Sequence, residues 1–461
     1  MIRRFRRGTW AARPLEPAVD ATSLRKMFET MLPLDIIEAA VERLGVRQRE
    51  RLMDPVALVF SLVLMGGTWE SARIATVMRD YFDRGAPRAA RGSYYKWFDE
   101  QLLELMIELS NAALKHARAM PKHLPGVLAG RVDWRAVDST VVKLHQVLAD
   151  VYPGTGEYAS LKVHKEYSLG IENVVAYHIT PGRRHDGPEL VVDERRRGTG
   201  LIVDLAYASF NLLRDCERFD VQVVVKLKGG WKVFVDDLAD STHWVGDENV
   251  PGSAHEPINL KVFDALLDID VTVGPDDDTI PIRLVGVPFA DEYALFLTSV
   301  PRSTHSAEEV AMIYRLRWGI EVDNKLVKTA CQLDEITAGR PVSAQILVHA
   351  SMLGSIMANA IVHLDNIEQG AVGTKTVRPK RPPLHPIAVW KIVVHGAAGI
   401  SEMLTNRATT DDAWVRIATN ITRGAGDPNW RNKPSALDRV KGRTPTGRAW
   451  RSGPPARGVR A

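Results

Sequence analysis

Cysteine is scarce in this chain. Only Cys216 and Cys331 occur among its 461 residues. Two cysteines are too few for a disulfide framework or for a zinc site built from cysteine ligands. This composition is typical of a reducing interior, so we expect a cytoplasmic protein.

An uninterrupted apolar run long enough to cross a membrane is also missing. The longest apolar stretch, residues 346–364, is interrupted by His349, Asn359 and His363. It is therefore expected to form a buried core helix, with no membrane partner. The opening segment "MIRRFRRGTWAARP" has no apolar stretch behind its arginines, so we expect no secretory signal.

Acidic residues are rare at both ends of the chain. Residues 1–14 hold five arginines and no acid, and residues 423–461 hold ten Lys or Arg against two Asp. Since the formal net charge is only +4, the residues between them are acidic overall. Basic ends suggest arms that follow DNA phosphates, and Trp430 and Trp450 between the arginines favour this reading. Solubilising flexible tails are the alternative.

The spacing of apolar residues divides the chain into regions. Residues 20–120 show helical spacing, so residues 1–130 are predicted to form a helical N-terminal domain that binds DNA. Within it, residues 72–98 place two helices around a Gly-, Pro- and Arg-rich turn. That pattern fits a helix-turn-helix DNA reader or an ordinary helix pair.

From residue 131 the spacing of apolar residues changes from the helical period to the period of β-strands. We expect a first strand that ends at Asp138, two strands in 159–180, a helix over 187–197, and a short apolar strand that ends at Asp204. The alternation of strands and helices predicts a mixed α/β sheet. Residues 229–303 are rich in strand patterns separated by turns, so they are predicted to form an inserted β-rich subdomain.

The stretch "YRLRWGIEVDNKLVKTA", residues 314–330, is predicted to form one helix. At 3.6 residues per turn, four of its polar side chains project within about 60° of one another; they are Tyr314, Arg317, Glu321 and Lys328. A solvated face with charge pairs is the plain alternative. Asp323 falls on the apolar side, and nothing in the sequence explains it.

Asp138, Asp204 and Glu321 are the candidate catalytic residues and metal ligands. An Asp that ends a strand is commonly a cap or turn residue, but two in one sheet with a Glu on a packed helix suggest a site. Three converging carboxylates repel one another unless cations lie between them. Two Mg²⁺ or Mn²⁺ ions, about 3.5 to 4 Å apart, would suit oxygen ligands and phosphodiester chemistry. Tyr314, Arg317 and Lys328 would then contact the DNA end.

These motifs resemble a known family. "VDST" at Asp138, "IVDLAYAS" at Asp204 and the pattern Y-x2-R-x3-E-x6-K at 314–328 resemble the DDE transposases of bacterial insertion sequences, in the insertion sequence 4 group. The resemblance implies a ribonuclease-H-like catalytic core over residues 131–228 and 304–340, interrupted by the insertion 229–303. It also implies two-metal DNA cleavage and strand transfer. Residues 341–422 would form a C-terminal helical region suited to dimerisation, and residues 423–461 a basic flexible tail.

The leading hypothesis is a transposase that cleaves the terminal inverted repeats of its own element and joins them to target DNA. It would act in the nucleoid as a homodimer on two DNA ends. A domesticated or inactive DNA-binding descendant is the alternative, and a metal-free carboxylate hydrolase of sugars is a third reading. "VDN" at 322–324 departs from the bulky apolar residues usual in this family. Further landmarks, which include His164, His185 and Asp186, are given no catalytic role.

Overall fold

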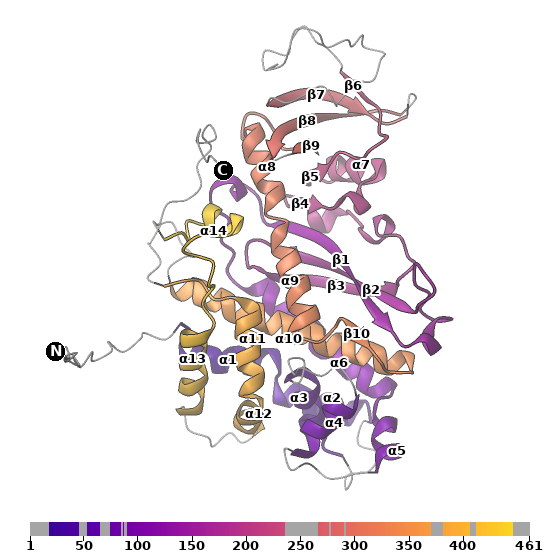
Figure 1. The fold of residues 1–461 in the computed structure, drawn as a ribbon, viewed down its shortest axis with the longest axis vertical. Coiled ribbons are helices and arrows are strands. Elements are labelled where there is room, and N and C mark those ends of the chain that lie inside the picture. Colours follow the sequence, from indigo (N-terminus) through magenta and orange to yellow (C-terminus); the bar gives the residue numbers. More distant parts are fainter. Residues whose placement is uncertain are drawn as a thin grey trace, which may run out of the picture.

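The fold is centred on one mixed β-sheet (Figure 1). This computed structural model describes residues 18–45, 53–64, 74–83, 86, 90–235, 266–275, 278–289, 292–369, 381–405 and 412–445. The strands are β1 Trp134–Leu144, β2 Ser160–Ser168, β3 Asn173–Pro181, β4 Gly200–Val203, β5 Gln222–Lys226, β6 Val233–Val235, β7 Leu267–Val273, β8 Ile280–Phe289, β9 Glu292–Thr298 and β10 Glu335–Ile336.

The strand order is β3-β2-β1-β4-β5-β9-β8-β7-β6, and β10 pairs with β1. Strands β1 to β3 form antiparallel pairs, whereas β4 and β5 run parallel to β1. This arrangement confirms the predicted mixed α/β sheet. The β-rich insertion continues the same sheet, because β9 pairs antiparallel with β5 and is followed by β8 and β7.

Strand β1 differs from its prediction. It does not end at Asp138 but runs on to Leu144. The residues after Asp138 alternate between the two faces and stay paired with β2 as far as Lys143 opposite Ser160. Asp138 therefore lies in the middle of a strand, at the point where the neighbouring strand β4 ends.

Helices cover the two faces of the sheet and form a layer beyond it (Figure 1). They are α1 Ala21–Met31, α2 Leu34–Arg43, α3 Pro55–Leu64, α4 Ile74–Asp83, α5 Arg91–Tyr94, α6 Glu100–Ala119, α7 Phe210–Arg218, α8 Ala307–Arg315, α9 Trp318–Thr329, α10 Pro341–Glu368, α11 Pro386–His395, α12 Ala397–Thr405, α13 Asp412–Gly424 and α14 Ala436–Val440. The predicted helix over 187–197 is wrong. This segment forms only two short 3₁₀ turns, and the Asp193 side chain caps the second of them.

Helix α10 is the centre of the helical layer. It packs against α6 and α3 from the N-terminal region and against α9 and α11. By length and composition it would be able to span a membrane, but 94% of its apolar window is buried inside this fold. That is the pattern expected of a core helix. Since helices from both ends of the chain share this core, the predicted domain boundaries at 130 and 341 stay predictions.

The C-terminal segment corrects another expectation. Residues 424–445 are not a flexible tail, because they pack on the body of the protein. Arg443 and Lys441 are buried and pair with Glu172, which lies in the turn between β2 and β3. Trp430 is buried as well and donates its ring N–H to the Arg443 carbonyl at 2.6 Å. The basic residues of 1–14 and 446–461 lie outside the described residues.

Two histidines on α10, the buried His363 and the partly buried His349, make stability depend on pH. Burial lowers the pKa of both His349 and His363 to about 4. In the unfolded chain these histidines become protonated as the pH falls below about 6.5. In the folded chain they stay neutral until about pH 4. Their contribution is therefore complete above pH 6.5 and is lost towards pH 4, by up to about 1.4 kcal/mol per pH unit for each histidine.

We expect His349→Gln to reduce the dependence of the unfolding free energy on pH between 6.5 and 4. Glutamine is polar but does not titrate, so one of the two proton uptakes disappears. Urea unfolding followed at a series of pH values measures this slope. An unchanged slope in the variant would contradict the assignment of a neutral His349.

Candidate active site

The pairing of β1 with β4 brings two of the predicted carboxylates together. These strands are parallel, with Val137 opposite Val203. Asp138 follows Val137 and Asp204 follows Val203, so the two aspartates lie side by side where β4 ends. Asp204 starts a short 3₁₀ turn, and its side chain makes no capping hydrogen bond there. Both side chains are partly buried.

The helix predicted over residues 314–330 is two helices. Helix α8 ends at Arg315 and α9 begins at Trp318. Between them the backbone tightens to i→i−3 hydrogen bonds, such as Arg317 N–H to the Tyr314 carbonyl at 3.0 Å. A Cβ on Gly319 would come within 3.1 Å of the Tyr167 ring, so this glycine lets α9 approach β2 closely. The four-residue polar stripe is thus divided, with Tyr314 on α8 and Glu321 and Lys328 on α9.

The guanidinium of Arg317 lies among the candidate carboxylates. It donates to Glu321 Oε1 at 2.6 Å and lies over the Tyr314 ring, 5.8 Å from its centroid. Burial acts to lower the pKa of Arg317, but its neighbours outweigh burial and raise the pKa; they are the Tyr314 hydroxyl group and the carboxylates of Asp204, Glu321 and Asp138. Arg317 is thus a cation that pairs directly with Glu321 and lies close enough to Asp138 and Asp204 for their charges to raise its pKa.

Asp138 lies in an environment that disfavours its charge. Burial raises the pKa of its carboxyl group, and the nearby charge of Asp204 acts in the same direction, against the Ser139 N–H and Arg317. Its Oδ1 accepts from the Ser139 backbone N–H at 2.8 Å. Its Oδ2 accepts from Asn324 Nδ2, also at 2.8 Å. Sequence reasoning missed Asn324, and its position three residues after Glu321 was the available signal.

Asp323 has a structural role that the sequence could not reveal. It is 1% exposed, and its carboxylate pairs with Lys165 Nζ at 2.5 Å. Ser355 and Asn359 of α10 donate to its other oxygen at 2.5 and 2.7 Å. Lys165 is the cross-strand partner of Asp138 on β2. The buried pair therefore holds α9 against the strands that carry Asp138.

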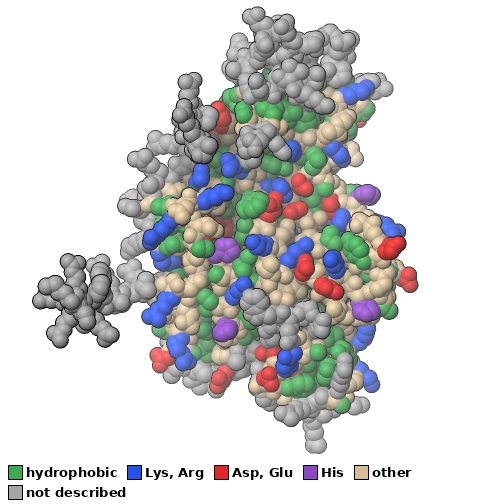
Figure 2. All heavy atoms as spheres, viewed as in Figure 1, with side chains coloured by type: hydrophobic (Ala, Val, Ile, Leu, Met, Phe, Trp, Pro, Cys, Tyr) green, Lys and Arg blue, Asp and Glu red, His purple; other side chains and the backbone are tan. Residues whose placement is uncertain are grey.

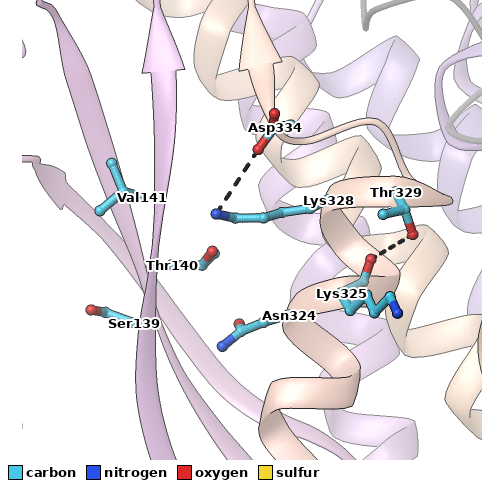
Figure 3. Close-up of a pocket in the computed structure, with 8 residues that line it drawn as sticks. All are labelled: Ser139, Thr140, Val141, Asn324, Lys325, Lys328, Thr329 and Asp334. Atoms are coloured by element: carbon cyan, nitrogen blue, oxygen red, sulfur yellow. Dashed lines mark hydrogen bonds and ion pairs between the residues drawn. The ribbon is translucent and has the colours of Figure 1, made fainter.

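An open cavity of about 620 Å³ adjoins this site, between β1 and α9. Figure 3 shows Lys328 and Asn324 pointing from α9 towards Thr140 on β1. The Lys328 ammonium lies 3.9 Å from the carboxylate of Asp334, which also lines the cavity. Tyr314 lies on α8 and is not among the residues that line this cavity; its ring packs on that of Phe296, with 4.7 Å between the ring centroids.

The landmark histidines lie apart from this arrangement. His164 faces the other side of the sheet with Ser139, where its ring nitrogens contact the Tyr207 and Thr180 hydroxyl groups at 3.1 and 2.9 Å. Asp186 accepts from Ser139 Oγ at 3.0 Å. Burial lowers the pKa of His164 to about 4. These contacts give structural reasons for both residues, and His185 is exposed.

The donor set fits a hard divalent cation. In the described part of the chain, no three His, Cys, Asp or Glu side chains are grouped closely enough to hold a metal ion. Yet Asp138, Asp204 and Glu321 supply only oxygen donors, which Mg²⁺ and Mn²⁺ prefer. Asn324, whose Nδ2 contacts Asp138, has a buried Oδ1 without a hydrogen-bond partner among the described residues. Three carboxylates and an orphaned amide oxygen are groups that such a cation would satisfy.

The comparisons with known proteins point to one family. Residues 133–356 match the model of the transposase DDE domain. A putative transposase InsL for insertion sequence element IS186A of Escherichia coli is 39% identical over 70 residues, which cover 15% of this chain but 19% of that relative. A probable transposase for insertion sequence element IS5377 of Geobacillus stearothermophilus is 24% identical over 316 residues, covering 67% of this chain and 76% of that relative.

One solved structure, a piggyBac transposase synaptic complex with hairpin DNA, aligns with 87% of this chain and 85% of that chain. Its sequence identity is 11% and the TM-score is 0.43. A score at this level is too low to assign a shared fold.

The buried pair of Lys165 and Asp323 generates a stability prediction. Asp323→Leu alone should reduce the unfolding free energy by about 3 to 5 kcal/mol, because it leaves a buried ammonium without its partner. The double variant Lys165→Met with Asp323→Leu should recover much of that loss. Urea unfolding gives both values, and Glu29→Ala, which removes the exposed pair with Arg25, is the control. Equal losses in the single and double variants would contradict the pairing.

Proposed function

Since residues 133–356 belong to the transposase DDE domain family, we propose that this chain is the transposase of a bacterial insertion sequence. It would cleave the terminal inverted repeats of its element and join the freed ends to target DNA. The observation that carries the proposal is the register of β1 and β4, which brings Asp138 beside Asp204 at the end of β4. Glu321 on α9 would complete the set, and it pairs with Arg317 at 2.6 Å.

Divalent metal ions are the general cofactor of this family, and we assign two Mg²⁺ or Mn²⁺ ions to Asp138, Asp204 and Glu321. When bound, such ions would lower the pKa of a hydroxyl nucleophile and stabilise charge on the leaving oxygen. The protein's own groups would orient the DNA. Arg317 would exchange its carboxylate partner for a phosphate, to which a guanidinium can bind through two N–H groups. Tyr314 would contact the strand end.

The proposed partner is double-stranded DNA, at the element ends and at the target. On the face seen in Figure 2, basic and acidic side chains are interspersed, so contacts would depend on local groups such as Lys328 and on basic residues beyond the described part. The proposal includes DNA binding by residues 1–130, a homodimer on two DNA ends, and a cytoplasmic, nucleoid-associated location. The intact carboxylate set argues against a descendant that only binds DNA.

Cleavage should depend on a divalent metal and on each carboxylate. We expect Asp138→Ala, Asp204→Ala and Glu321→Ala to abolish cleavage of a labelled duplex that carries the element's own ends. Binding of the same duplex in a gel-shift assay should survive, because the carboxylates do not attract DNA. Chelation of the metal should have the same effect on the native chain.

Glu104→Ala, which removes an exposed carboxylate on α6, is the matched control and should cleave normally. Full strand transfer by any one of the three active-site variants would falsify the assignment.

Lys328 generates a separate prediction. If it contacts a DNA phosphate, Lys328→Ala should weaken binding of different duplexes to a similar extent and reduce the slope of log affinity against log salt by about 1. Fluorescence anisotropy at several salt concentrations measures that slope. Arg197→Ala, which removes an exposed arginine paired with Glu194, is the control. A salt slope that Lys328→Ala leaves unaltered would remove this residue from the DNA contacts.

A further inference from the structure

Asn324 stands out as a polar side chain that holds one of the candidate metal ligands. Its Nδ2 donates to Asp138 Oδ2 at 2.8 Å, while the other Asp138 oxygen accepts from the Ser139 N–H. In Figure 3 it points from α9 towards β1 and away from the neighbouring Lys325. Both oxygens of Asp138 therefore already have a donor.

The other half of the same amide is unsatisfied. Asn324 Oδ1 is buried and has no hydrogen-bond partner among the described residues. A buried acceptor left without a partner costs about 1 to 3 kcal/mol, so it calls for a physical reason. Leucine or another apolar residue of similar size would avoid this cost at the same position. The hydrogen bond that Nδ2 donates to Asp138 therefore does not by itself explain why an amide side chain occupies this position.

An amide offers a donor and an acceptor, which exchange places when the group turns by half a rotation about its Cβ–Cγ bond. After that turn the amide oxygen would face the Asp138 carboxylate. Two such oxygens repel each other unless a cation lies between them, and a divalent cation with oxygen ligands removes the repulsion. The one side chain can therefore suit both the metal-free and the metal-bound site.

We propose that Asn324 is a fourth oxygen ligand of the metal site. Without metal, its amide N–H groups hold the Asp138 carboxylate; with metal, its Oδ1 joins Asp138 in binding the cation. The inference rests on the proposed metal-dependent function and adds a ligand that the three-carboxylate motif does not contain. It is specific to the "VDN" segment, where Asp323 anchors the helix and the next residue reaches the site.

Mn²⁺ titration of the full chain by calorimetry, without DNA, tests the proposal in a readout other than activity. We expect Asn324→Leu to weaken Mn²⁺ binding by about 10-fold or more, the usual effect of losing a group that supports a metal site. Asn324→Asp keeps the oxygen but cannot donate, so it should bind Mn²⁺ at least as tightly as the native chain. Its melting temperature should fall without metal, from repulsion with Asp138, and recover when Mn²⁺ is added.

Asn432→Asp, the same change at an exposed asparagine before α14 and outside this cavity, is the control and should bind Mn²⁺ as the native chain does. If Asn324 only positions Asp138 through its N–H groups, Asn324→Asp will weaken Mn²⁺ binding as Asn324→Leu does, and the proposal is wrong. Native affinity in Asn324→Leu would also overturn it. Should Asn324→Leu fail to fold, the comparison of Asn324→Asp with the native chain still decides.

The same titration separates this inference from the proposed function. If Asp138→Ala weakens Mn²⁺ binding but Asn324→Leu does not, only the role of Asn324 is wrong. If the native chain and Asp138→Ala bind Mn²⁺ equally, the metal site itself is wrong, and the proposed function fails with it.

Discussion

The buried ion pair between Lys165 and Asp323 sets the position of the helix that carries half of the candidate site. It joins β2 to α9, while Ser355 and Asn359 join the same carboxylate to α10. A buried charge without partners would be strongly unfavourable. Helix α9 must therefore lie on the sheet in the position that keeps Asp323 paired with Lys165. That position places Asn324 against Asp138. It also fixes Glu321, one turn earlier on the helix.

The site is built from two kinds of constraint. Backbone pairing in the sheet determines that Asp138 and Asp204 are neighbours, and side-chain contacts determine how α9 approaches them. Arg317 then pairs with Glu321 as an internal cation. Asp138 and Glu321 thus already have donors from the protein's own groups. If metal and DNA bind here as proposed, each would have to compete with these contacts.

Much of the fold could be predicted from the sequence, because strand periods and short apolar runs depend on local pattern. The mixed sheet and the β-rich insertion followed from such patterns. The end of β1 did not, since pairing with β2 carries the strand beyond Asp138. The break between α8 and α9 was missed as well, because the close approach of Gly319 to Tyr167 is a tertiary contact. The role of Asp323 could not be predicted, because its partner Lys165 lies 158 residues earlier in the chain.

The central claim is that Asp138, Asp204 and Glu321 form one cation site. Its most direct test is the anomalous scattering of Mn²⁺ in crystals of the native chain bound to cleaved element ends. The account predicts anomalous peaks within bonding distance of all three carboxylates, about 2.0 to 2.3 Å for hard oxygen ligands. Active crystals with Mn²⁺ bound elsewhere, and none between these three residues, would contradict it.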